Sequence, residues 1–158
     1  KLIEQSDFFE FTEFPDKLGY PINNICIKGE SKSDVSIITY GGMLPIVLNA
    51  VKEIFITDEI VTNVIVPSVI KPIDFAPIHE KHLSSHILIA EESIKYGGWG
   101  SEVLSQLHEM NYYPQKTINR IGAKEFVLPC SLPLENQILP QSKDIYNSII
   151  KLYEQKNN

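Results

Sequence analysis

Two adjacent carboxylates followed by a cluster of glycines are the residues of this chain whose types and spacing could do chemistry. Glu91-Glu92 follow the apolar run Ile87–Ala90, and Gly97-Gly98-Trp99-Gly100 lead into Ser101. Carboxylates serve as general acids, general bases or hydrogen-bond acceptors, and glycines at the start of a helix can expose backbone N–H groups to an anion. The stretch is therefore an active-site loop, an anion cradle or a structural turn.

The spacing of the two carboxylates argues against catalysis. Adjacent residues of an extended chain point to opposite faces, so Glu91 and Glu92 cannot converge on one bond as an acid and a base. One of them is expected instead to accept hydrogen bonds from backbone N–H groups of the following loop. The structural turn predicted here consists of Glu91, Glu92, Gly97, Gly98 and Gly100.

The glycine cluster matches neither of the common phosphate-binding motifs. It is not G-x-G-x-x-G, and no Lys follows where a phosphate-loop Lys would stand. Glycines also permit positive φ and a close approach of the next helix to the sheet, which favours packing over binding. An anion contact through Gly98, Trp99, Gly100 and Ser101 remains the alternative.

The histidines and cysteines give no recognisable catalytic or metal motif. His79, His82 and His86 have loose spacing and no acid or Cys to complete a zinc site, so no metal is expected. Cys26 and Cys130 are far apart and lack C-x-x-C spacing, which favours reduced thiols in a cytosol-like compartment. No G-x-S-x-G nucleophile motif occurs, and no catalytic residue is assigned.

Composition excludes several classes of protein. The 158 residues are 43% apolar and 22% charged, which is typical of a globular chain of one ordinary domain. The net charge is −6 and Arg120 is the only arginine, so a nucleic-acid partner is not expected. No apolar run approaches the ~20 residues that span a bilayer, and no secretory signal is recognised, so no membrane partner and a cytoplasmic location are expected.

Apolar and β-branched runs alternate with segments of helical periodicity from Asp34 onward. The expected strands are 35–40, 63–66, 87–90 and 117–121, with one more short strand at 21–27. The expected helices are 43–54, 73–82, 101–110 and 143–153. This order predicts right-handed crossovers and an α/β fold: a three-layer α/β/α domain around a mostly parallel, mixed sheet of about five strands.

Four stretches in register resemble a known family. They are DVSIITYGGM (34–43), VIKPIDFAPI (69–78), ILIAEESIKYGGWGSEV (87–103) and PLENQILPQSKDI (133–145). They are similar to the C-terminal domain of transketolase-like thiamine diphosphate enzymes, and most similar to the β subunit of the decarboxylating component of 2-oxo-acid dehydrogenase complexes (pyruvate or branched-chain type). The resemblance covers residues 21–158 and implies that residues 1–20 are the end of a preceding pyrimidine-binding domain.

The resemblance implies a non-catalytic domain for subunit assembly and partner docking. In the parent enzyme, thiamine diphosphate and Mg²⁺ would lie between other domains, and the parent would oxidatively decarboxylate a 2-oxo acid and acylate lipoyl groups. This chain alone is expected to be inactive, to bind no cofactor and to leave Phe8, Phe9 and Phe11 exposed. The implied partners are a second copy in a dimer, an α subunit and the acyltransferase core, in the cytoplasm or in a mitochondrial or plastid matrix.

Three alternatives stay open at this point. The parent is a transketolase or a deoxyxylulose-phosphate synthase-like transferase; the chain is a stand-alone module that binds a small anion or nucleotide; or it is a small hydrolase with a triad assembled in space. The docking acids of the resembled family would fall near residues 109–114, where this chain is aromatic, so no docking residue is carried over.

Overall fold

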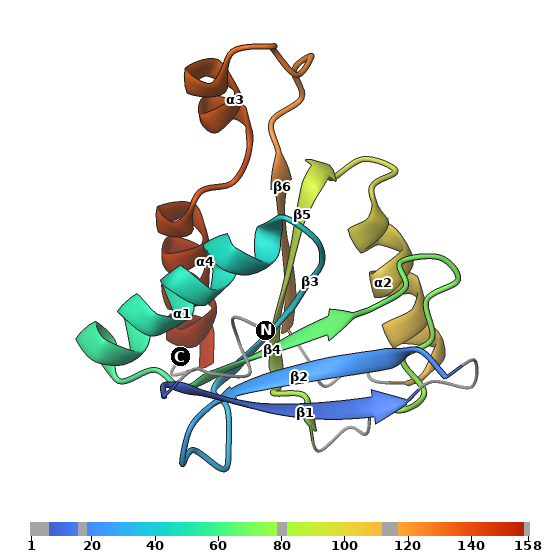
Figure 1. Cartoon of the computed structure of the whole chain (residues 1–158), viewed down its shortest axis with the longest axis vertical. Coiled ribbons are helices and arrows are strands. Elements are labelled where there is room, and N and C mark those ends of the chain that lie inside the picture. Colours follow the sequence, from blue (N-terminus) through green and yellow to red (C-terminus); the bar gives the residue numbers. More distant parts are fainter. Residues whose placement is uncertain (1–6, 16–18, 79–81, 112–116, 157–158) are drawn as a thin grey trace.

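A six-stranded mixed sheet forms the middle layer of the molecule (Figure 1). The structure is a computed structural model, and it describes residues 7–15, 19–78, 82–111 and 117–156. The strands are β1 (Phe9–Pro15), β2 (Pro21–Ile27), β3 (Val35–Thr39), β4 (Thr62–Pro67), β5 (His86–Ile94) and β6 (Thr117–Ala123). Their order across the sheet is β1-β2-β4-β3-β5-β6.

The four strands β4, β3, β5 and β6 run parallel, and β1 and β2 are antiparallel additions at one edge. Every residue of β3 and β4 is buried, as expected for parallel strands covered on both faces. The predicted three-layer α/β fold is confirmed, with six strands where about five were expected. The sixth strand is β1, in a segment for which the sequence predicted no strand.

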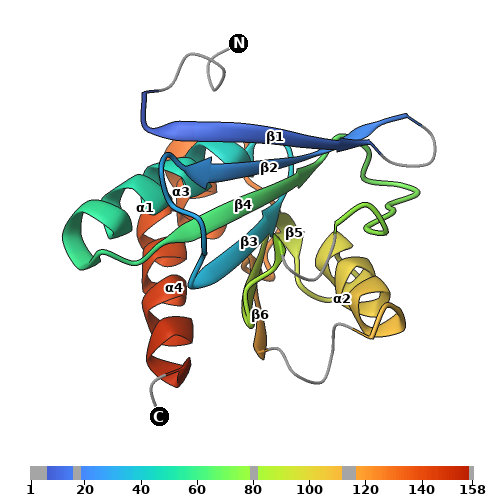
Figure 2. The same ribbon diagram turned by 90° about the horizontal axis from the view of Figure 1, so that it is seen from below.

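Helices cover both faces of the sheet (Figures 1 and 2). Helices α1 (Met43–Asp58) and α4 (Ser142–Lys156) pack together on one face, and α2 (Trp99–Glu109) covers the other. A short helix, α3 (Leu132–Ile138), stands apart at one end of the molecule and was not predicted. None of these described helices combines the length and apolar character that crossing a bilayer demands.

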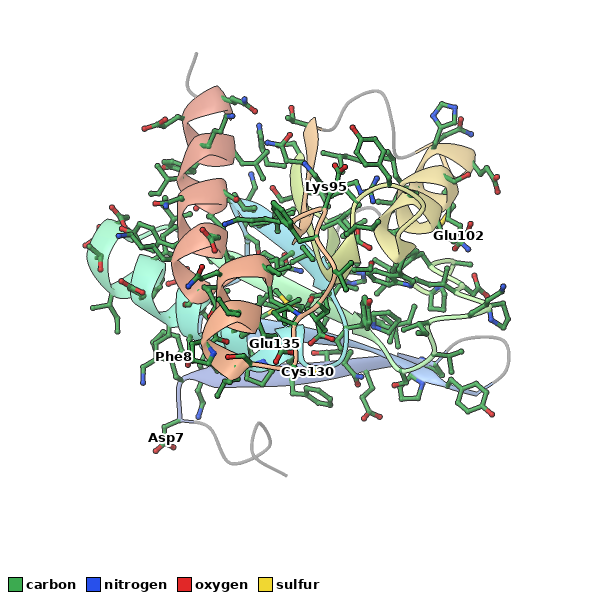
Figure 3. All side chains as sticks on the ribbon, turned by 90° about the horizontal axis from the view of Figure 1, so that it is seen from above. Asp7, Phe8, Lys95, Glu102, Cys130 and Glu135 are labelled. Carbon is green, nitrogen blue, oxygen red and sulfur yellow. The ribbon has the colours of Figure 1, made fainter. Side chains whose placement is uncertain are left out.

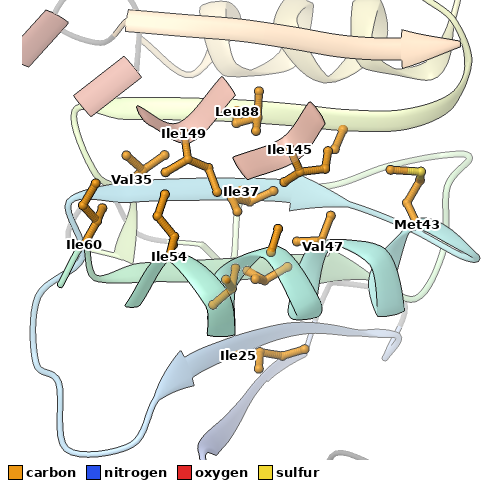
Figure 4. Packing of buried hydrophobic residues seen from close by; sticks show 14 of the residues in the cluster. Ile25, Val35, Ile37, Met43, Val47, Ile54, Ile60, Leu88, Ile145 and Ile149 are labelled. Carbon is orange, nitrogen blue, oxygen red and sulfur yellow. The ribbon is translucent and has the colours of Figure 1, made fainter. Parts of the chain in front are cut away.

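The larger apolar cluster lies between α1, α4 and the sheet (Figure 4). Val47 and Ile54 of α1, Ile145 and Ile149 of α4, and Ile37 of β3 meet there with no exposed surface. The apolar positions of α1 recur at the spacing of one helical face, and Pro45 is tolerated because it falls in the first turn, where its missing N–H is not needed. The periodicity of the sequence therefore determined this layer.

The predicted helix over residues 73–82 is wrong for residues 73–78, and residues 79–81 lie outside the described part of the chain. Residues 73–78 are irregular with one turn: Asp74 Oδ1 accepts a hydrogen bond from the Ala76 N–H at 2.9 Å, and the Ile78 N–H donates to the Phe75 carbonyl at 2.8 Å. A helix begun at Ile73 would put Pro77 inside it, where proline lacks a donor and clashes with the preceding turn. The side chains of Ile73, Phe75 and Ile78 are buried in the apolar cluster between α2 and the sheet, although this segment is not helical. Their spacing resembles one face of a helix, but it reflects burial alone.

The aromatic residues near the start of the chain belong to the fold more than the sequence suggested. Phe8 and Phe9 are partly buried against the larger cluster, and the Phe8 ring also meets Phe55 of α1 edge-on at 5.7 Å. The expectation that both would be exposed is wrong, because β1 pairs with β2 and carries them onto the sheet. Phe11 is exposed, at 37% of its surface, as expected.

Truncating Ile149 tests the packing of the larger cluster. Ile149→Ala should lower the free energy of unfolding by about 2–5 kcal/mol, because it removes buried methylene groups and leaves a cavity between α4 and the sheet. Lys151→Ala, at an exposed position of the same helix, should change it by less than about 0.5 kcal/mol. Urea unfolding followed by circular dichroism measures both, and equal effects would contradict the packing described.

Candidate functional site

The Glu91 carboxylate is buried at the end of the parallel strands and has partners on both oxygens. Glu91 lies on β5 with 0% of its surface exposed. Its Oε2 accepts hydrogen bonds from the Gly100 N–H at 3.0 Å and from the Ser93 hydroxyl at 2.5 Å. Its Oε1 accepts one from Arg120 Nη2 at 2.8 Å. A buried carboxylate must be paired in this way, since an isolated one would carry a large desolvation cost.

Arg120 reaches this carboxylate from the neighbouring strand. It lies on β6 opposite Ile89, and its Nη2 also donates to the Lys95 carbonyl at 2.6 Å. One guanidinium therefore joins β6, β5 and the loop that follows β5. Such charge-assisted bonds are shorter and stronger than neutral ones, so Arg120 fixes the path of the chain between β5 and α2.

Glycines around Glu91 leave the space that its side chain occupies. A Cβ on Gly100 would lie 2.6 Å from Glu91 Oε1, and one on Gly98 would lie 2.5 Å from Glu91 Oε2. On β6, a Cβ on Gly122 would lie 2.5 Å from the Ser93 carbonyl oxygen. Gly97 has a different requirement, a φ of +66° that L side chains rarely adopt.

Glu92 points to the opposite face of the sheet. A Cβ on Gly42, the residue that precedes α1, would overlap Glu92 Oε1. Glu91 is thus at the start of α2 and Glu92 is beside the start of α1, where the partial positive charge of a helix N-terminus favours a carboxylate. The two carboxylates serve different helices and share no common target.

Three of the four residues of the alternative anion contact donate hydrogen bonds within the chain. The Gly100 N–H donates to Glu91, the Ser101 N–H donates to the Gly98 carbonyl at 3.0 Å, and the Ser101 hydroxyl donates to the Lys95 carbonyl at 3.3 Å. The Trp99 indole N–H donates to the Ile70 carbonyl at 3.2 Å. The chain's own Glu91 carboxylate thus accepts a backbone N–H at the start of α2, where an anion would bind.

Tyr40 lies beside this network, just after β3. Its ring meets the Trp99 ring edge-on at a centroid distance of 4.6 Å. Burial raises the pKa of the Tyr40 phenol above its ordinary value, a hydrogen bond with Ser93 lowers it, and the negative charges of Glu91 and Glu92 raise it further. The net direction is upward, so this phenol keeps its proton at neutral pH.

The sequence missed four members of this arrangement. Ser93, Arg120, Gly122 and Tyr40 come from three segments that only the fold brings together. One signal was available: Arg120 is the only arginine of the chain, and it interrupts a predicted strand. An arginine in a half-buried strand needs a carboxylate partner.

The other candidates of the sequence lie outside this site. Among the residues that the structure describes, no group of His, Cys, Asp or Glu is arranged to hold a metal. His86 is buried on β5, His82 stacks near Phe14 at 4.6 Å, and His79 lies outside the described residues. Of the segment 109–114, only residues 109–111 are described, at the end of α2.

The ionisation of Tyr40 gives a pH dependence. Because its folded-state pKa is raised, the folded chain holds the phenolic proton more tightly than the unfolded chain. The resulting stabilisation is present below the ordinary tyrosine pKa of about 10 and is lost as the pH rises through the raised folded value. Trp99, the only tryptophan, should be quenched by the adjacent tyrosinate over this range.

Fluorescence of Trp99 against pH measures this titration directly. The midpoint should lie above that of free tyrosine, and Tyr40→Phe should remove the transition. A transition that survives in the Tyr40→Phe variant would show that another group is responsible.

Comparison with known proteins agrees with this architecture. The family model of the transketolase C-terminal domain matches residues 25–145. A 1-deoxy-D-xylulose-5-phosphate synthase from Geobacillus sp. (strain WCH70) is 36% identical over 90 residues, covering 56% of this chain and 14% of that protein. The pyruvate dehydrogenase E1 component subunit beta of Gracilaria tenuistipitata var. liui is 29% identical over 119 residues, covering 73% of this chain and 36% of that protein. The chain thus spans about a third or less of these relatives.

Solved structures share the fold. A split-gene transketolase, described as an inactive β4 tetramer, superimposes with a TM-score of 0.65 at 28% identity, covering 79% of this chain and 40% of that one. A 2-oxoglutarate:ferredoxin oxidoreductase from Magnetococcus marinus, at a TM-score of 0.53 and 14% identity, covers 83% of this chain and 20% of that one and shares the fold alone. With more than half of its residues matched by the family model, the chain belongs to the transketolase C-terminal domain family.

Proposed function

We propose that this chain is the non-catalytic assembly domain of a thiamine diphosphate-dependent enzyme, most closely a 2-oxo-acid dehydrogenase β subunit. The observation that carries the proposal is the Glu91 carboxylate, whose two oxygens accept three hydrogen bonds from inside the chain. A catalytic acid or base must reach a substrate proton, and this carboxylate is buried. Glu91, Glu92 and the glycines then act as parts of a structural turn.

The extent of the alignments supports a dehydrogenase β subunit as the parent. The E1 β subunits of Gracilaria tenuistipitata and Pisum sativum align over 119 and 127 residues, or 73% and 79% of this chain. The second candidate parent is a deoxyxylulose-phosphate synthase-like transferase. The synthase of Listeria innocua favours it with a higher identity of 38%, but over only 103 residues.

Thiamine diphosphate and Mg²⁺ are assigned to the parent enzyme and not to this chain. The start of α2 is where a diphosphate would find backbone N–H groups. There, the Gly100 N–H is engaged by the buried Glu91, and a diphosphate would face that negative charge at close range. The same argument disfavours a stand-alone anion or nucleotide module that uses residues 98–101.

Self-association follows from the same proposal. The Gracilaria relative is named as a subunit of pyruvate dehydrogenase E1, and the split-gene transketolase is described as a β4 tetramer. We assign to this chain contacts with a second copy and, in the parent, with an α subunit and an acyltransferase core. Decarboxylation of the 2-oxo acid and acylation of lipoyl groups belong to that assembly, in the cytoplasm or an organelle matrix.

Titration with thiamine diphosphate tests the cofactor assignment. Isothermal calorimetry of the chain with thiamine diphosphate and Mg²⁺ should give no binding heat, because the buried Glu91 carboxylate takes the Gly100 N–H and would repel a diphosphate at the start of α2. Titrating ATP or inorganic phosphate while following Trp99 fluorescence should likewise give a flat response. Micromolar uptake of thiamine diphosphate would overturn the assembly-domain proposal, and a phosphate-dependent Trp99 signal would favour the anion module.

Substitution of Glu91 tests its structural role. Glu91→Ala should lower the free energy of unfolding by about 2–4 kcal/mol, because it leaves the Arg120 guanidinium, which is four-fifths buried, without its carboxylate partner. This range is lower than for a fully buried pair, because Arg120 keeps some contact with solvent. Glu92→Ala, at the adjacent exposed position, should have a much smaller effect. Thermal and urea unfolding measure both. An undiminished stability of Glu91→Ala would argue that the carboxylate is kept for another purpose.

A further inference from the structure

A polar pocket lies at the amino ends of the parallel strands, at the opposite end of the sheet from Glu91. Its volume is about 360 Å³, and we call it the amino-end pocket. Its floor consists of Asn24 and Cys26 of β2 and Asn63 of β4. Its walls are residues 30–33, between β2 and β3, and residues 82–85, before β5. Both of these segments lie at the lower end of the molecule in Figure 1, away from α3.

The sheet changes from apolar to polar as it reaches this pocket. On each of three neighbouring strands, a buried isoleucine of the α2 side is followed toward the pocket by a buried polar residue two positions away. Residues two apart on a strand lie on the same face. The pairs are Ile22 and Asn24 on β2, Ile65 and Asn63 on β4, and Ile38 and Ser36 on β3. Packing alone favours more isoleucine, because buried polar groups cost free energy unless they are bonded.

Hydrogen bonds within this floor fix the orientation of the Asn24 amide. Ser36 Oγ donates to Asn63 Oδ1 at 2.7 Å, and Asn63 Nδ2 donates to Asn24 Oδ1 at 2.8 Å and to the His82 carbonyl at 3.0 Å. Because Asn24 Oδ1 is engaged in this way, its Nδ2 is the group turned toward Cys26, and it donates to Cys26 Sγ at 3.2 Å.

Asn24 keeps one donor for a ligand. An amide nitrogen carries two protons, and only the bond to the Cys26 sulfur, a weak acceptor, is formed by Asn24 Nδ2 within the described part of the chain. The residue is only 7% exposed and lines the pocket. A buried donor without an acceptor is costly, so an acceptor in the pocket would stabilise this arrangement.

The walls of the pocket offer hydroxyl groups and a balanced charge. Ser31 and Ser33 make no side-chain hydrogen bond among the residues that the structure describes. Glu30 and Lys32 contribute one charge of each sign, and Glu10 adds a negative charge on β1 opposite Cys26. An anion would therefore meet the two carboxylates and a cation would meet Lys32, which leaves an uncharged ligand as the best match.

We propose that the amino-end pocket binds an uncharged small molecule with several hydroxyl groups, of the size of a hexose or a cyclitol. Hydroxyl groups both donate and accept, so one ligand can take the Asn24 N–H and bond with the serine hydroxyls at the same time. A cavity of about 150 Å³ holds a benzene ring, so this pocket accommodates a six-membered ring with its substituents. This inference goes beyond the assembly role proposed above and does not depend on it.

Nuclear magnetic resonance of the full 158-residue chain tests the proposal. D-Glucose, myo-inositol and sorbitol are titrated in turn while the side-chain amide signals of Asn24 and Asn63 are followed. At least one of the three should shift both signals with a millimolar or lower dissociation constant, which is typical of small polar ligands. Glycine, a zwitterion, and inorganic phosphate, an anion, should leave both signals unchanged.

Three variants connect this response to the pocket. Asn24→Ala should raise the dissociation constant about tenfold or more, because it removes the donor of the floor. Ser31→Trp should weaken binding similarly by filling the rim, and it leaves the hydrogen bonds of the floor intact should Asn24→Ala fold poorly. Asn23→Ala is the matched control: Asn23 is the preceding residue of β2, donates to the Val66 carbonyl at 3.2 Å and does not line the pocket. It should bind like the unsubstituted chain.

Cys26 supplies an independent readout, because its thiol lines the pocket. Cys130 is exposed on the α3 side of the molecule (Figure 3), so Cys130→Ser removes the competing thiol. Burial raises the pKa of Cys26, so its alkylation by iodoacetamide is followed at alkaline pH, where the thiolate is populated. The polyol that shifts the amide signals should halve the alkylation rate at the concentration that half-saturates those shifts.

Four outcomes would overturn the proposal. They are no response to any of the three polyols, binding that persists undiminished in Asn24→Ala and Ser31→Trp, an equal or stronger response to glycine or phosphate, and an alkylation rate of Cys26 that the polyol leaves unchanged. All four concern the amino-end pocket alone, so the proposed function is decided separately by the titration with thiamine diphosphate.

Discussion

One buried carboxylate determines the geometry at the end of the parallel strands. Glu91 leaves β5 toward α2 and accepts hydrogen bonds from the Gly100 N–H, Ser93 and Arg120. The partners come from the start of α2, from the end of β5 itself and from the adjacent strand β6. Because an unpaired buried carboxylate is so unfavourable, these elements are held in one relative position. Gly98 and Gly100 follow from that requirement, since a Cβ at either would collide with the carboxylate.

The same carboxylate occupies a position where related folds often keep a ligand. Ligands of open α/β sheets usually bind at the carboxyl ends of the strands. Here, that position near α2 contains an internal ion pair, and Trp99 and Tyr40 close the adjacent side. Large apolar side chains are exposed further along, in the segment after β6 and on α3.

Much of the fold could be predicted from the sequence, because local patterns determined it. Alternation of apolar runs and helical faces predicted the parallel strands, α1, α2 and α4. Failures occurred where a pattern had two physical meanings. Ile73, Phe75 and Ile78 have the spacing of a helical face, yet Pro77 excludes a helix there. Their side chains are buried between the sheet and α2 in an irregular segment. The phenylalanines near the start of the chain showed no period, yet pairing with β2 makes a strand of them.

For the site, the sequence by itself determined that Glu91 and Glu92 point to opposite faces, because that depends only on the extended backbone. It also determined that the glycines fit no phosphate motif. Only the tertiary structure decided which carboxylate is buried and that Arg120, 29 residues away, pairs with Glu91. It alone revealed that α3 is left uncovered. Local backbone geometry is determined by neighbouring residues, whereas charge pairing and burial depend on distant segments that the folded sheet brings together.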